Sequence, residues 1–133
     1  MRTETGPWWR QAQADLETAE AVLQARRFYA VSWFAQQAVE KGLKALYLES
    51  RGVLAPRTHD LEFLATEVSV PEDLRPDISL LNPTFDMSRY PNSSEGIAPV
   101  DLVSEARAIQ HLDAVRRVFR WLAQQLADTF PRS

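Results

Sequence analysis

Residues 34–48 have the sequence FAQQAVEKGLKALYL, in which a few polar side chains interrupt a run of alanine, leucine and tyrosine. Apolar residues cover more than one stripe of this helical segment, so we expect it to pack against neighbours on two sides, as the central helix of a bundle does. The predicted helix extends from about Phe28 to Ser50. Gly52 follows it and suits the left-handed position after a helix end.

The same stretch holds Lys41 and Lys44, the only lysines among the 15 basic residues of the chain. Either these lysines lie on a solvated edge of the helix or they serve a site that binds an anion. In the first interpretation Glu40 and Lys44 form an i,i+4 surface pair that contributes a few tenths of a kcal/mol.

Further helices are predicted on both sides of this segment. Apolar residues three and four apart trace one helical stripe over residues 7–27, and Pro7 suits its first position, while Arg26 and Arg27 would complement the dipole at its end. After a hinge, THDLEFLATEV (58–68) predicts a short helix capped by Thr58 or Asp60. A second short helix is expected to begin near Pro71 or Pro76 and to end before Pro83.

The segment DMSRYPNSSEGIAP (86–99) is rich in residues that favour turns, so it predicts an ordered turn followed by a loop. A third long helix then runs from about Pro99 or Asp101 to Ala127 on the strength of its apolar stripe. No β-type alternation, glycine-rich turn between strands or internal repeat is present. The sequence therefore predicts one all-α domain over residues 1–133, an antiparallel up-and-down helical bundle with three long and about two short helices.

Composition excludes several functional classes. The chain of 133 residues has no cysteine, which removes disulfides and zinc–thiolate sites and agrees with a reducing compartment. Its first residues lack the apolar core of a signal peptide and no apolar run is long enough to cross a membrane, so we expect a cytoplasmic protein. A net charge of −3 argues against a generally basic nucleic-acid binder, although a local basic patch remains open. Four glycines and two histidines supply neither a phosphate-binding loop nor a metal cluster, so no cofactor or metal is expected.

Three local features remain as candidate sites, each with a plainer alternative. His59 lies in THDL at a helix start, where it either caps and packs or binds a ligand. Arg107 and His111 are four apart on the last helix and share a face, so they form either a solvated surface or a pair that binds and cleaves RNA. Arg89 lies between polar residues and Tyr90-Pro91, which suggests a positioned cation in the loop.

The chain resembles the HEPN (higher eukaryotes and prokaryotes nucleotide-binding) domain family in three segments: AVEKGLKALYL on the second helix, THDLEFL at the start of a short helix, and DMSRYPN before the last long helix. The resemblance spans nearly the whole chain. It implies an antiparallel helical bundle, frequent homodimers, and frequent pairing with a small nucleotidyltransferase in toxin–antitoxin-like modules. Some members of the family are metal-independent ribonucleases.

The resemblance implies a nucleotide- or RNA-binding site formed by the matching residues, which are Lys41, Lys44, His59, Arg89 and Tyr90. Ribonuclease members use an arginine followed after four to six residues by a histidine, and this chain lacks that spacing. Arg107 and His111 have three residues between them, and Arg57 and His59 have one.

The leading hypothesis is a homodimeric HEPN-type module that binds a nucleotide or RNA phosphate and acts with a small nucleotidyltransferase partner. Four tryptophans and broad apolar faces also favour a homodimer. The first alternative is an endoribonuclease toxin whose arginine and histidine meet across a dimer interface. The second is a structural dimerisation domain in which Lys41, Lys44 and Arg89 form intramolecular ion pairs.

Overall fold

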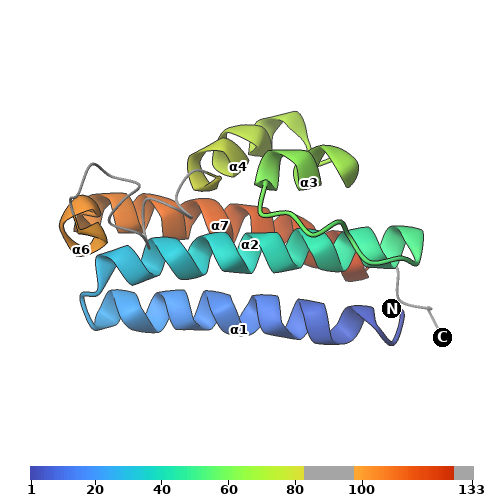
Figure 1. Cartoon of the computed structure of the whole chain (residues 1–133), viewed down its shortest axis with the longest axis horizontal. Helices are drawn as coiled ribbons and strands as arrows, with labels where there is room; N and C mark the ends of the chain where they lie inside the picture. Colours follow the sequence, from blue (N-terminus) through green and yellow to red (C-terminus); the bar gives the residue numbers. More distant parts are fainter. Residues whose placement is uncertain (83–97, 128–133) are drawn as a thin grey trace.

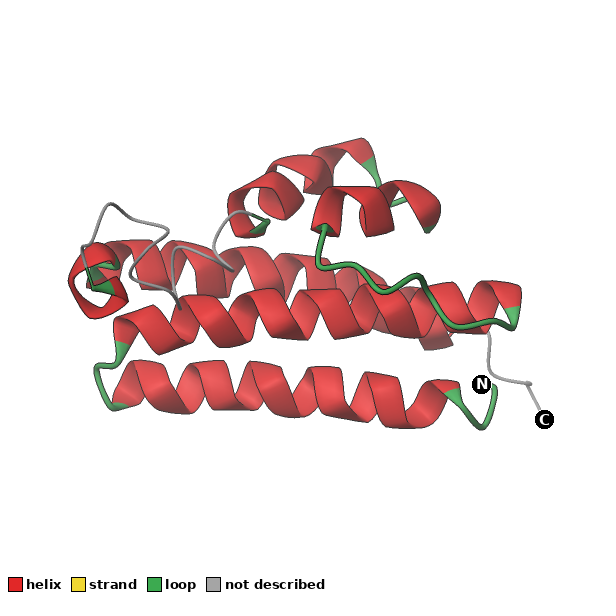
Figure 2. Ribbon diagram, in the orientation of Figure 1, coloured by secondary structure: helices red, strands yellow, loops and turns green. Residues whose placement is uncertain are grey.

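The computed structural model describes residues 1–82 and 98–127 of the chain. Within those ranges every regular element is a helix, which confirms the all-α prediction (Figures 1 and 2). The predicted loop over residues 86–99, with Arg89 and Tyr90, lies almost wholly outside the described residues. The elements are α1 (Thr5–Gln24), α2 (Phe28–Arg51), α3 (Leu61–Glu67), η1 (Glu72–Leu74), α4 (Arg75–Leu81), α6 (Pro99–Leu102) and α7 (Glu105–Ala127).

The turn between α1 and α2 is tighter than the sequence predicted. α1 ends at Gln24, and Arg26 adopts a left-handed φ of 60°. The backbone N–H of Arg27 donates to the carbonyl of Val22 at 2.9 Å, which closes the helix end. The prediction that Arg26 and Arg27 belong to the last helical turn was therefore wrong, because the chain has already reversed there.

The three long helices lie side by side, and α2 occupies the position between α1 and α7 that its broad apolar surface predicted (Figure 1). α1 and α2 are antiparallel, as in an up-and-down bundle. α7 runs in the same direction as α2: Ser32 near the start of α2 meets His111 near the start of α7, and Gly42 further along meets Leu122. The short helices α3 and α4 account for this arrangement, since they lie over α2 and α7 on the path that connects them (Figure 1).

α7 approaches α2 closely at Gly42. A Cβ atom placed on Gly42 would lie 2.7 Å from Cδ1 of Leu122, a side chain with no exposed surface. The missing side chain thus lets α7 pack against the α2 backbone. Beside this point the rings of Trp9 and Phe119 stack with centroids 5.1 Å apart, which joins α1 to α7.

The short helices are fixed by polar contacts as well as by packing. Asp60, one of the two predicted caps, accepts hydrogen bonds from the backbone N–H groups of Glu62 at 3.0 Å and Phe63 at 3.3 Å. α4 ends at Leu81, before Pro83, as predicted. A two-pronged ion pair between Asp77 and Arg117, with both N–O distances at 2.9 Å, ties α4 to α7.

The last helix is interrupted near its start. The sequence predicted one helix from Pro99 or Asp101, but Val103 is extended (φ −106°, ψ 111°) and separates α6 from α7. Ser104 then begins α7, because its side-chain oxygen accepts a hydrogen bond from the N–H of Arg107 at 3.1 Å. The single-helix prediction missed this cap. No helix in the described ranges is both long and apolar enough to cross a membrane.

Candidate functional site

A buried carboxylate on α2 organises the polar face of the bundle. Glu40 is only 5% exposed, yet it carries three contacts. Lys44 Nζ donates to Oε2 at 3.1 Å, and His59 Nδ1 and Gln36 Nε2 donate to Oε1 at 2.8 and 3.3 Å. A buried charge is tolerated when it is paired and hydrogen-bonded in this way. Glu40 thus holds Lys44 of its own helix and His59 of the following segment in one cluster.

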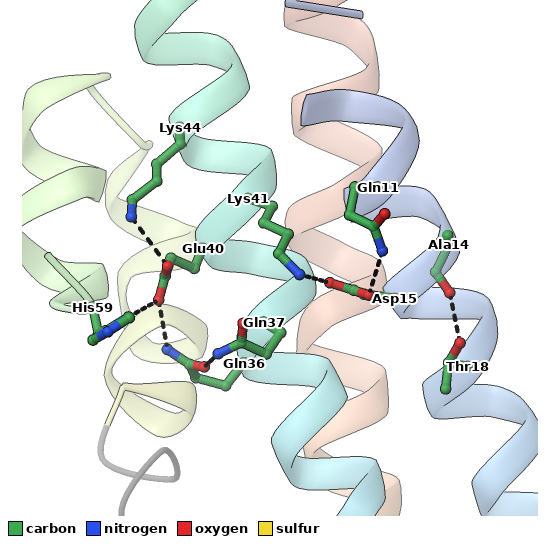
Figure 3. Close-up of polar contacts among 10 residues, drawn as sticks. All are labelled: Gln11, Ala14, Asp15, Thr18, Gln36, Gln37, Glu40, Lys41, Lys44 and His59. Atoms are coloured by element: carbon green, nitrogen blue, oxygen red, sulfur yellow. Dashed lines mark hydrogen bonds and ion pairs between the residues drawn. The ribbon is translucent and has the colours of Figure 1, made fainter. Parts of the chain in front are cut away.

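Lys41 belongs to a different cluster, although it is only three residues from Lys44. Its Nζ lies 2.5 Å from Oδ2 of Asp15, a buried residue of α1, and Gln11 donates to the other carboxylate oxygen at 3.0 Å. Figure 3 shows the two lysines leaving α2 in different directions, Lys41 toward α1 and Lys44 toward Glu40 and His59. Each lysine is therefore held by its own buried acid.

Two small pockets bring these lysines back into one region, because both are lined by Trp8. One, of about 220 Å³, is lined by Trp8, Lys44, Leu54, Ala55, Pro56 and Arg57. The other, of about 230 Å³, is lined by Pro7, Trp8, Gln11 and Lys41. We call the two pockets together the Trp8 cleft. It lies where the first turns of α1 meet the middle of α2 and the segment that follows α2.

Arg57 is the basic residue of the Trp8 cleft whose charge is not neutralised by an acid in the described ranges. Lys41 and Lys44 are both ion-paired, and their side chains are only 25% and 11% exposed. Arg57 is exposed and forms no ion pair with any residue in the described ranges. Its guanidinium is thus available to an anion, while the two lysines and their acids set the local field.

The Trp8 cleft has the side-chain types that bind a nucleotide. An indole ring offers a stacking surface for a base, and a guanidinium forms strong charge-assisted hydrogen bonds with phosphate. The imidazole of His59 is held through Nδ1 by Glu40, and its side chain is 62% exposed. Such a carboxylate–histidine contact orients the ring and fixes which nitrogen carries the proton.

The structure places three of the five predicted site residues. Lys44 and His59 share Glu40, and Lys44 and Lys41 each line one of the two pockets that share Trp8. His59 lines neither pocket. Arg89 and Tyr90 lie outside the described residues. The Glu40–Lys44 pair exists at the predicted i,i+4 spacing, but it is largely buried and is not a surface pair.

Sequence reasoning missed Trp8, Arg57 and the central role of Glu40. The apolar stripe predicted over residues 7–27 includes Trp9 and not Trp8, which follows Pro7 in the first turn of the helix. Arg57 lies in the non-helical segment after α2. Helical periodicity does not apply there, so the sequence does not predict which residues surround it. The signal for Glu40 was present in its spacing from Lys44, but the burial that makes it an anchor depends on packing.

Arg107 and His111 do not form an exposed pair. Arg107 is exposed, whereas His111 is 1% exposed and its Nδ1 shares a hydrogen bond of 2.6 Å with Oγ of Ser32 on α2. Burial, with a smaller contribution from the charge of Arg107, lowers the pKa of His111 from 6.5 to about 4. The ring is therefore uncharged at neutral pH. Both sequence interpretations fail for His111, which is neither a solvated surface residue nor a group placed to reach RNA.

No cluster of three or more potential metal ligands occurs among the residues that the structure describes. The aromatic and basic side chains that line the Trp8 cleft are those of Trp8, Lys41, Lys44 and Arg57.

Within the described ranges the chain is an all-helical bundle, with a cleft of basic and aromatic residues beside its central helix. The model of the HEPN domain family matches residues 6–126, so the chain belongs to the HEPN domain family.

Two solved structures resemble the chain over nearly its whole length. The crystal structure of TT1696 from Thermus thermophilus has a TM-score of 0.85 and 26% identity, covering 93% of this chain and 99% of that one. The crystal structure of ST0689, an archaeal HEPN homologue, has a TM-score of 0.74 and 25% identity, covering 94% of this chain and 98% of its own. The comparison with curated proteins gave no match.

Proposed function

We propose that the protein is a nucleotide- or RNA-binding module, and that the Trp8 cleft binds a phosphate together with an adjacent base. The observation that carries the proposal is the exposed Arg57, without an ion pair in the described ranges, on the same pocket wall as Lys44 and Trp8. In this site Arg57 contacts the phosphate and Trp8 stacks on the base, while Lys41 and Lys44 line the adjoining walls together with their carboxylate partners. His59 completes the site, and Arg89 and Tyr90 contribute from the loop, as the resemblance implies.

The ion pairs of Lys41 and Lys44 limit the affinity that this site can reach. Each lysine already has a carboxylate, so a phosphate near it must compete with Asp15 or Glu40. Arg57 meets no such competitor among the described residues and should contribute most of the direct contact energy.

Binding can be measured by fluorescence anisotropy with a short fluorophore-labelled single-stranded RNA, and by tryptophan quenching with ATP. Arg57→Ala should weaken RNA binding about tenfold and lower the slope of log K against log[salt] by about 0.7, the value for one lost phosphate contact on a single strand. Trp8→Ala should weaken binding by a similar factor with the salt slope unchanged, because stacking releases no counterions.

Arg10→Ala is the matched control. Arg10 is an exposed α1 residue that does not line the cleft, and its removal costs the same single charge. Equal losses for Arg57→Ala and Arg10→Ala would mean that only net charge matters. Binding that is absent from the wild-type protein would leave the structural alternative, in which Lys41 and Lys44 serve only their buried acids.

We further propose a homodimer that acts in the cytoplasm with a small nucleotidyltransferase, the two proteins forming a toxin–antitoxin pair, since the family resemblance implies these associations. The identity of the neighbouring open reading frame tests the partner first. If it encodes a small nucleotidyltransferase, co-expression and size-exclusion chromatography should recover a complex, and separate elution would contradict the pairing.

The contact between Glu40 and His59 favours a second candidate function, metal-independent cleavage of RNA. His59 would act as the general base that removes the proton of a ribose 2′-hydroxyl, while Glu40 stabilises the imidazolium that forms. The 2′-oxygen attacks the adjacent phosphorus to give a 2′,3′-cyclic phosphate, and the P–O5′ bond breaks as the leaving 5′-oxygen takes a proton from water. Incubation with RNA in the presence of EDTA decides this point. His59→Gln should abolish cleavage and His111→Gln should preserve it, whereas intact RNA with the wild-type protein would leave the binding function alone.

A further inference from the structure

A groove of about 470 Å³ runs between α1 and α7, away from the Trp8 cleft. Every residue that lines it belongs to one of these two helices. Apolar side chains form its centre, and charged side chains form its edges. The apolar residues are Trp9, Leu16, Phe119 and Ala123, and the charged ones are Glu17 and Glu20 on α1 and Arg116 and Arg120 on α7.

The groove exists because α1 and α7 both pack on α2 and touch each other little. Trp9 and Leu16 are partly buried at the margin of the core and do not lie within it. The groove therefore presents aromatic and aliphatic surface that no other described element lines. Partly covered apolar surface of this kind gains free energy when a partner excludes water from it.

The charges on the two edges have opposite signs, and they are only partly used within one chain. Glu20 and Arg116 form an ion pair across the groove at 3.4 Å, which places their helices at the same level there. Glu17 and Arg120 are exposed and have no ion pair in the part of the chain that is described. Each copy thus offers one acid on α1 and one arginine on α7.

A two-fold axis along the groove uses both groups. Rotation by 180° about this line places the α1 of one copy over the α7 of the other without changing the level of any residue. Glu17 of each copy then approaches Arg120 of the partner. An axis across the groove would instead place α1 over α1 and oppose like charges, which is unfavourable.

We propose that the α1–α7 groove is the interface with a second copy of this chain, and that Glu17 and Arg120 form reciprocal ion pairs across a two-fold axis along the groove. The inference rests on the proposed homodimer and specifies its face. Covering the apolar side chains of the groove favours association, and the two reciprocal pairs fix the orientation.

Charge reversal tests the face directly, with molecular mass measured by sedimentation equilibrium. Glu17→Arg and Arg120→Glu should each raise the dimer dissociation constant at least about tenfold, because each creates two like-charge contacts. Mixing the two variants should restore association as a heterodimer, since each new side chain then meets an opposite charge. The double variant Glu17→Arg/Arg120→Glu should dimerise with itself for the same reason.

Asp73→Arg and Arg107→Glu are matched controls, since they reverse single exposed charges away from the groove and should leave the mass unchanged. Circular dichroism establishes that every variant is folded. A wild-type dimer that survives both reversals places the interface elsewhere and overturns this inference while the homodimer stands. A monomeric wild-type protein overturns both, and the RNA-binding assay with Arg57→Ala is independent of either result.

Discussion

The stability of this protein should fall between pH 6.5 and pH 4 because of one residue, His111. The ring is 1% exposed and uncharged in the folded state, with a pKa of about 4, whereas an unfolded histidine has a pKa near 6.5. The unfolded state therefore binds the proton first. Above pH 6.5 His111 does not reduce the free energy of unfolding. As the pH falls from 6.5 toward 4, protonation of His111 in the unfolded state lowers that free energy progressively.

The difference between the two pKa values corresponds to about 3 kcal/mol of unfolding free energy, since one pKa unit equals about 1.4 kcal/mol. Urea unfolding followed by circular dichroism at pH 7.5, 6.5, 5.5 and 4.5 measures it. Carboxylates also titrate toward the acid end of this range, so the informative quantity is the difference between the wild-type protein and His111→Gln. Between pH 7.5 and pH 4.5 we expect the wild-type protein to lose most of this roughly 3 kcal/mol of unfolding free energy relative to His111→Gln.

NMR provides a second measurement, because the chain contains only two histidines. The variant His59→Gln assigns the ring signals, and it should retain the pH-dependent loss of stability that His111 causes. A free-energy difference between the wild type and His111→Gln that stays constant with pH would refute the argument. So would a His111 ring that titrates near 6.5, because either result means that the ring is solvated.

Two further predictions concern stability at neutral pH. Arg117→Ala should destabilise the protein by about 1–3 kcal/mol in urea unfolding. The reason is that the carboxylate of Asp77, which is 8% exposed, then loses its two-pronged ion pair. The control Arg107→Ala, on the same helix, should cost under about 0.5 kcal/mol. Ser69→Gly should raise the thermal midpoint and stabilise the protein by up to about 1 kcal/mol, because the exposed Ser69 follows α3 with a left-handed φ of 60°. Ser69→Ala should give no such gain. Equal midpoints for the two variants would count against backbone strain at this position.

The fold was predictable where periodicity and capping rules operate locally. The apolar surface of residues 34–48 identified the central helix, and Asp60 identified the start of α3. The breaks at Arg26 and Val103 were not predictable in the same way. Arg26 adopts a conformation that usually selects glycine, and its exposed side chain pairs with Glu105, 79 residues away. Local rules cannot include a partner at that distance.

The direction of α7 illustrates the same limit at the level of the chain path. Short connections make consecutive helices antiparallel, which is correct for α1 and α2. The segment from residue 52 to residue 104 is long enough to return the chain to the start of α2, so α7 can run parallel to it. The contact between Ser32 and His111 is a consequence of that path. The burial of His111 could not be predicted for the same reason. The sequence shows which face of the helix His111 is on, but it does not show that this face packs against Ser32 of α2.

The two lysines show why a candidate site can be located by sequence while its chemistry is not. Residues three apart on a helix are separated by about 60° around its axis, enough for Lys41 and Lys44 to reach different neighbours. Lys41 reaches Asp15 on α1, and Lys44 reaches Glu40 on its own helix. Both acids are buried, so removing either lysine would leave a buried carboxylate without its lysine partner and would cost stability as well as any binding. A mutational test at the lysines would therefore confuse the two roles, and the exposed Arg57 is the position where a loss of binding can be separated from a loss of folding.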